Sequence, residues 1–139
     1  MAREDYQKAL KKGERSYARY LSEGKYPYLQ VLEELLSHTD VVAEEDLGIC
    51  SIPSEMIVGT FTAGRRTSFA PNFMPLLDDE SEFAAKWQTL YNAHLEEGIH
   101  DPSKCYEFMN RYSVLEGNQR VSGLTCCGAP SVQGTVTRM

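Results

Sequence analysis

The stretch Val114–Leu124, VLEGNQRVSGL, decides the fold of this chain. An apolar run ends before Glu116, a glycine follows, and a helical pattern begins near Gln119. A strand–glycine–helix turn of this kind points free backbone N–H groups and the positive end of the helix dipole at one spot, where Arg120 adds a planar donor suited to phosphate oxygens. Two interpretations stay open: an anion-binding turn, or a structural turn in which Arg120 pairs with Glu116 or Glu107.

The residues around this turn predict a hairpin before it and a helix and a strand after it. Two β-rich runs meet at Asn110–Arg111, which indicates a tight hairpin. The residues from 121 to 127 predict a short helix that ends at Gly128, and the residues from 132 to 136 predict a last strand.

Upstream, the periodic apolar residues between Phe83 and Leu95 predict a helix capped by Asp78–Asp79. The apolar run 47–52, LGICSIP with its closing proline, predicts the opening strand. Between these two elements, residues 60–73, TFTAGRRTSFAPNF, lack periodicity and predict a long polar loop, a type of segment that is often functional or mobile.

The N-terminal part has a different character, because residues 4–21 and 27–36 both carry apolar residues at helical spacing. We therefore expect residues 1–46 to form a helical arm and residues 47–139 to form an α+β domain with a small mixed sheet. The apolar stripe of the arm is expected to pack on this domain, and the alternative is a homodimer contact through the arm.

Composition limits the partners of the chain. Lys plus Arg number 14 and Asp plus Glu number 20, for a net charge of −6. The densest basic cluster, Lys8, Lys11, Lys12, Arg15 and Arg19, is interleaved with acids and is typical of a solvated helix face, so DNA binding by this chain alone is not expected.

We expect no membrane span and no secretory signal, and hence a cytoplasmic protein with free thiols. The four cysteines lack C-x-x-C spacing, so no metal site is expected.

The ordered series of motifs in residues 84–136 resembles the ParB/sulfiredoxin-like superfamily. The pieces that carry the resemblance are Gly98–Pro102, the hairpin and turn CYEFMNRYSVLEGNQRVSGL, and Gly128–Val132. The chain is also similar to the ParB-like module at the N-terminus of some bacterial multidomain proteins, most closely in NFMPLLDDESEFAAKW and MNRYSVLEGNQRVS.

This resemblance implies a fold that binds a nucleoside triphosphate with Mg²⁺, with Gly117 and Arg120 at the phosphates and Glu116 as the leading acid. Asn118 stands where a sulfiredoxin carries its reactive cysteine, so thiol-based reduction is not expected. Asn118 and Gln119 together replace the Glu-Arg pair of typical ParB proteins, which removes a charge-assisted phosphate contact.

The resemblance and the loop composition together complete the predicted site. Arg65 and Arg66 lie in the long Gly/Thr-rich loop and are expected to close over the phosphates. The first hypothesis is a nucleotide- or phosphate-binding module in which Glu116, Gly117, Asn118, Gln119 and Arg120 form the site. The alternatives are a degenerate regulatory or interaction domain and a small-molecule phosphotransferase; nuclease activity is not expected, and no catalytic residue is assigned.

Overall fold

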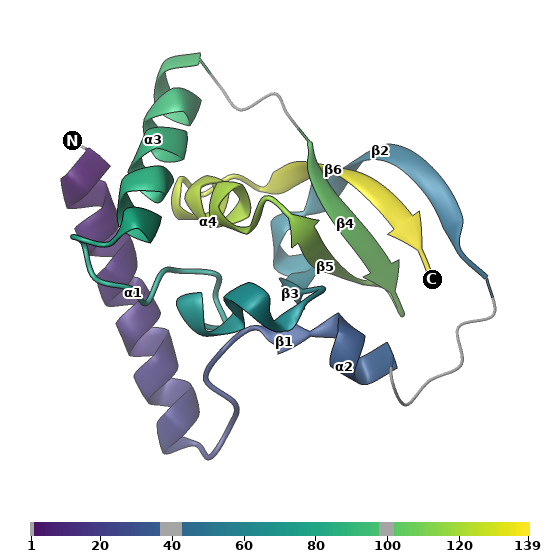
Figure 1. Cartoon of the computed structure of the whole chain (residues 1–139), viewed down its shortest axis with the longest axis horizontal. Coiled ribbons are helices and arrows are strands. Elements are labelled where there is room, and N and C mark those ends of the chain that lie inside the picture. Colours follow the sequence, from purple (N-terminus) through teal and green to yellow (C-terminus); the bar gives the residue numbers. More distant parts are fainter. Residues whose placement is uncertain (1, 37–42, 98–101) are drawn as a thin grey trace.

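The computed structural model describes residues 2–36, 43–97 and 102–139, and its centre is a six-stranded mixed sheet with the order β1-β3-β5-β4-β6-β2 (Figure 1). The α+β class, the small mixed sheet and the N-terminal helix agree with the sequence analysis. The strands are β1 (Gln30–Val31), β2 (Glu45–Pro53), β3 (Ile57–Thr60), β4 (Ser103–Phe108), β5 (Arg111–Glu116) and β6 (Ser131–Arg138). The α-helices are α1 (Ala2–Ser22), α2 (Leu32–Leu36), α3 (Glu82–Glu97) and α4 (Asn118–Cys126). The 3-10 helices are η1 (Ser54–Met56) and η2 (Ala63–Ser68).

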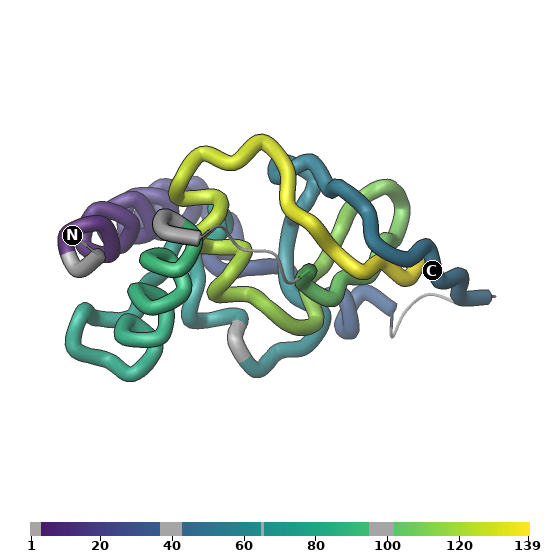
Figure 2. The backbone as a smooth tube through the Cα atoms, turned by 90° about the horizontal axis from the view of Figure 1, so that it is seen from above, coloured from purple at the N-terminus to yellow at the C-terminus, as the bar shows by residue number. Residues whose placement is uncertain are grey.

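The three longer helices gather at one end of the molecule, and the far end of the sheet lies opposite them (Figures 1 and 2). Trp87 of α3 holds them together. Its ring meets Tyr6 of α1 edge-on at 5.2 Å and stacks on Tyr91 at 5.0 Å, while its indole N–H donates to Ser122 Oγ of α4 at 2.9 Å. Because Tyr6 and Ala9 are fully buried, α1 packs on the rest of the fold as expected.

The hairpin between β4 and β5 is present, but its turn lies one residue earlier than predicted. Both central residues, Met109 and Asn110, have positive φ values of 53° and 63°. This is the backbone of a type I′ turn, whose twist matches that of the paired strands. Arg111 therefore starts β5 instead of occupying the turn.

The helix predicted over 27–36 is wrong at Gln30–Val31, which form β1 and pair in parallel with β3. A side chain on Gly59 would lie 2.2 Å from the Gln30 carbonyl oxygen, so glycine permits this close strand approach. The predicted boundary at residue 46 stays a prediction, although β1 joins the sheet from within the arm.

The loop predicted over 60–73 is correct only in part. It contains η2, and its apolar residues Phe69, Ala70 and Phe73 are buried in the core. Phe69 also bridges to Pro75. Phe69 and Phe73 are therefore packed in the core although the segment has no regular secondary structure around them. Strand β3, which precedes the segment, was not predicted.

Two helix boundaries differ from the prediction. Ser81 caps α3, since its Oγ accepts the Ala84 N–H at 3.1 Å, while Asp78 instead accepts the Glu80 N–H in the turn before it. The other helix, α4, begins at Asn118. Among the described residues, no helix is long and apolar enough to cross a membrane.

Candidate functional site

The site lies where strand β5 ends and helix α4 begins. Gly117 adopts the left-handed conformation, with φ 103° and ψ 24°, and its carbonyl oxygen accepts the Val121 N–H at 2.9 Å to open the helix. No side chain in the described part of the chain caps this end of α4. The N–H groups of residues 118–120 therefore have no acceptor within the helix, and they lie at the positive end of its dipole.

Ser103 of β4 lies directly against this turn. Its side chain is 1% exposed, and its Oγ has no hydrogen-bond partner among the described residues. A Cβ atom placed on Gly117 would lie 2.5 Å from Ser103 Oγ and 3.2 Å from Arg120 Nη1. The hydroxyl, the guanidinium and the start of α4 thus surround a small hollow that only glycine leaves open.

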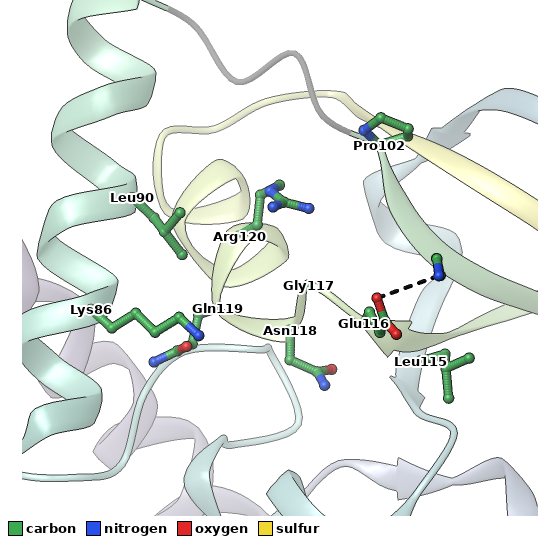
Figure 3. Close-up of a pocket in the computed structure, with 10 residues that line it drawn as sticks. Lys86, Leu90, Pro102, Leu115, Glu116, Gly117, Asn118, Gln119 and Arg120 are labelled. Atoms are coloured by element: carbon green, nitrogen blue, oxygen red, sulfur yellow. Dashed lines mark ion pairs between the residues drawn. The ribbon is translucent and has the colours of Figure 1, made fainter.

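Gly117 and Arg120 also line a cavity of about 520 Å³, here called the Gly117 cavity. That size is within the usual range for small-molecule sites. Figure 3 shows the guanidinium of Arg120 pointing into the space between α4 and β4. The lining residues are Lys86, Leu90, Pro102, Lys104, Leu115, Glu116, Gly117, Asn118, Gln119 and Arg120, which include all five residues predicted from the turn motif.

The charges of the cavity are mostly positive. Lys104 Nζ lies 3.7 Å from Glu116, an exposed pair of little energetic weight (Figure 3). The other two cations, Lys86 and Arg120, make no ion pair with any residue that the structure describes. Glu107 instead pairs with Arg138 at 2.7 Å. The structural interpretation, in which Arg120 pairs with Glu116 or Glu107, is therefore not what the described contacts show.

The two amide residues have different orientations. Gln119 is buried and donates from Nε2 to the Phe83 carbonyl oxygen at 3.1 Å, so its side chain ties α4 to α3 and leaves its backbone N–H for the cavity. Asn118 Nδ2 donates to Thr60 Oγ1 at 3.4 Å, while its Oδ1 is buried without a partner in the described part of the chain. Thr60 in turn donates to the Val114 carbonyl oxygen at 3.1 Å.

Of the two arginines predicted to close over the phosphates, the structure describes the side chain of Arg66 alone. Arg66 pairs with Glu34 of α2 and is not one of the lining residues. The side chain of Arg65 lies outside the described part of the structure. A role for these two arginines at the site stays a prediction.

Lys86 and Lys104 were missed by sequence reasoning. Lys104 stands opposite Glu116 because the β4–β5 register shifts between Lys104 and Cys105, an irregularity that the hairpin turn alone does not predict. Lys86 is on α3, far away in sequence, and no local pattern distinguishes it from other surface lysines. Of the Gly98–Pro102 motif, Pro102 lines the cavity, and residues 98–101 lie outside the described residues.

The cysteines lie away from the cavity lining. All four are free thiols, and burial raises the pKa of Cys105 to about 12. Within residues 2–36, 43–97 and 102–139, no group of three or more His, Cys, Asp or Glu side chains could hold a metal ion.

Comparison with known proteins shows a likeness to a solved structure. No protein-family profile matches the chain, and no curated protein sequence matches it. Among solved structures, the crystal structure of sulfiredoxin from Arabidopsis thaliana is 19% identical, with a TM-score of 0.44, over 63% of this chain and 82% of that chain.

Proposed function

We propose that this chain binds the phosphate group of a small molecule, in the first place a nucleotide, in the Gly117 cavity. The observation that supports this most strongly is the hollow at Gly117, where the uncapped start of α4, the Arg120 guanidinium and the Ser103 hydroxyl all lack partners in the described structure. Donors without acceptors at a helix N-terminus are what a phosphate oxygen requires.

The charge balance favours phosphate over a single carboxylate. Among the described residues, the cavity lining carries three cations, Lys86, Lys104 and Arg120, against one carboxylate, Glu116. A phosphate brings up to two charges and three acceptor oxygens, so it can accept from Arg120 and from the α4 N–H groups together. A monocarboxylate would leave most of these donors unsatisfied.

A nucleoside triphosphate would bring Mg²⁺ with its phosphates, because this ion is commonly held by one or two carboxylates together with substrate oxygens. Glu116 is the carboxylate that the described residues contribute to the cavity lining and would be its protein ligand, after release of its weak pair with Lys104. The described lining contains no aromatic ring on which a base could stack, so recognition is expected to centre on the phosphates.

Calorimetric titration with phosphate, pyrophosphate, ATP, CTP and GTP, each with and without Mg²⁺, tests the proposal. Arg120→Ala removes charge-assisted hydrogen bonds that together contribute about 1.5–3 kcal/mol to the binding free energy. The affinity should therefore fall roughly tenfold to a hundredfold. Arg111→Ala removes an exposed arginine outside the cavity and should leave affinity unchanged. Equal affinity in the wild type and Arg120→Ala would refute the site.

The same titrations separate the alternatives. If no anion binds, the interaction-domain hypothesis becomes the better one, because the fold would then be retained without a ligand. If a nucleoside triphosphate binds, incubation with γ-labelled ATP and small hydroxyl compounds tests phosphotransfer. Label on the acceptor would extend the proposal to catalysis.

A further inference from the structure

The solvent side of α1 carries a row of cations. Tyr6, Ala9 and Gly13 face the core, and a side chain on Gly13 would lie 2.2 Å from the Pro75 carbonyl oxygen. The basic residues recur at spacings of three and four, which confines them to an arc of about 100° on the opposite side of the helix. This basic face consists of Lys8, Lys11, Lys12, Arg15 and Arg19, all exposed.

The helical geometry separates these cations from Glu14, while Glu4 lies one turn before Lys8 at the N-terminal end of the same face. Glu14 lies on another side of α1, where it lines a cavity with Tyr17 and Tyr28. None of the five cations forms an ion pair with a described residue. The helix α1 holds six basic and three acidic residues, which leaves eight and 17 for the rest of the chain. The net charge is therefore +3 on α1 and −9 elsewhere.

Aromatic rings continue the basic face at its C-terminal end. The Arg19 guanidinium lies 5.4 Å from the Tyr20 ring centroid, and Lys25 Nζ lies 5.8 Å from it. Tyr28 contacts Tyr26 with ring centroids 5.7 Å apart, and Tyr26 is 50% exposed. These tyrosines line a cavity of about 400 Å³ together with Glu55 and with Lys25, which pairs with Glu23 at 3.4 Å. Cations therefore lead directly to an accessible aromatic surface.

The overall composition does not favour DNA binding, but the concentration of positive charge on α1 beside exposed rings changes this expectation, and we propose that the basic face and the tyrosines bind single-stranded nucleic acid. Phosphates follow the face from Lys8 to Arg19, a length of about 17 Å at 1.5 Å per residue, and an unstacked base lies against Tyr26. A duplex would offer its phosphates but keep its bases stacked, which leaves the rings unused. An anionic membrane fits less well, since the apolar side of α1 is buried in the core.

The site is separate from the Gly117 cavity, so either proposal can fail alone. Its first test is fluorescence anisotropy of a labelled 20-nucleotide oligo(dT) with the full chain between 50 and 200 mM salt. Five phosphate contacts predict a slope of log affinity against log salt of about −3.5. Replacing Lys8, Lys11 and Arg15 by Gln reduces the slope to about −1.4 and weakens binding at least tenfold at 50 mM salt.

A matched control makes the same change of net charge elsewhere. Asn92→Asp, Asn110→Asp and Gln133→Glu together add three negative charges at exposed positions outside α1. This variant is expected to bind within twofold of the wild type. Equal weakening of the control and the triple Gln variant would overturn the proposal, because the effect would then be one of overall charge.

The aromatic part has its own test. Tyr26→Ala is expected to weaken oligo(dT) binding fivefold or more with an unchanged salt slope. An abasic strand of the same length should bind the wild type at least fivefold more weakly than oligo(dT), and Tyr26→Ala should bind both strands alike. No binding of oligo(dT) at 50 mM salt, equal binding of the two strands by the wild type, or binding to anionic vesicles alone would overturn the proposal.

Discussion

Replacement of Gly117 by alanine tests the turn on which the site depends. Two costs add at this position. A left-handed backbone costs an L-residue about 1–2 kcal/mol, and the new Cβ, only 2.5 Å from Ser103 Oγ, adds overpacking of about 1–3 kcal/mol. We therefore expect Gly117→Ala to lower the free energy of unfolding by about 2–5 kcal/mol, measured by urea denaturation.

Gly128 supplies a matched control for the first of these costs. It also has a positive φ, 78°, but an added Cβ meets nothing within 4 Å. Gly128→Ala should consequently lose only the backbone cost of about 1–2 kcal/mol. The reasoning is refuted if both alanine variants lose the same free energy of unfolding.

A double-mutant cycle assigns the second cost to its partner. Ser103→Ala alone removes a buried hydroxyl that has no partner in the described structure, so it should leave the stability of the free protein unchanged or slightly higher. Combined with Gly117→Ala, it should recover part of the loss, since the Oγ contact is gone while a contact of 3.0 Å to Ser103 Cβ remains. Strict additivity of the two changes would contradict the proposed contact.

Three further outcomes are expected from the packing and the titratable groups. Ser122→Ala leaves the buried Trp87 indole N–H without its acceptor and should cost about 1–3 kcal/mol in urea unfolding; a loss below 0.5 kcal/mol would argue against this bond. The hydrogen bond from Arg138 lowers the pKa of Glu107 below its ordinary value of 4.5, so the stabilisation by this pair is complete above pH 4.5 and is lost as the pH falls through the lowered pKa. The difference in free energy of unfolding between the wild type and Glu107→Gln should therefore shrink over that acid range, and a constant difference would count against the pair. Burial raises the pKa of Cys105 to about 12, so at pH 8 mass spectrometry should find it unalkylated by iodoacetamide until the protein is unfolded; rapid labelling in the native state would contradict its burial.

The sequence predicted the elements whose signal is local. The helix stripe of α3, the β-rich runs of the hairpin and the Gly117 turn each depend on neighbouring residues, and the structure contains all three. Ser81 shows how a boundary can be missed nonetheless, because Asp78 and Asp79 offered equally good capping chemistry a few residues earlier.

The remaining features depend on contacts between distant segments. Gln30–Val31 have no strand pattern of their own and become a strand because Gly59 lets their backbone approach β3. The hollow at the site likewise needs Ser103, which lies 14 positions before Gly117 and carries no sequence signal of a ligand. Lys86 joins the cavity only through the packing of α3 on α4. Tertiary contact, not local propensity, decided each of these.

The pairing of β2 with β6 has a consequence for the way the protein is made. Its register joins Glu45 to Arg138, two of the most widely separated residues that are partners in this sheet. On the ribosome, β2 must therefore wait for nearly the whole described chain to emerge before its partner strand exists. Ile49, 68% exposed even in the finished fold, is unprotected during that interval. We expect slow maturation and a need for chaperone protection at this strand, since such distant pairings close late.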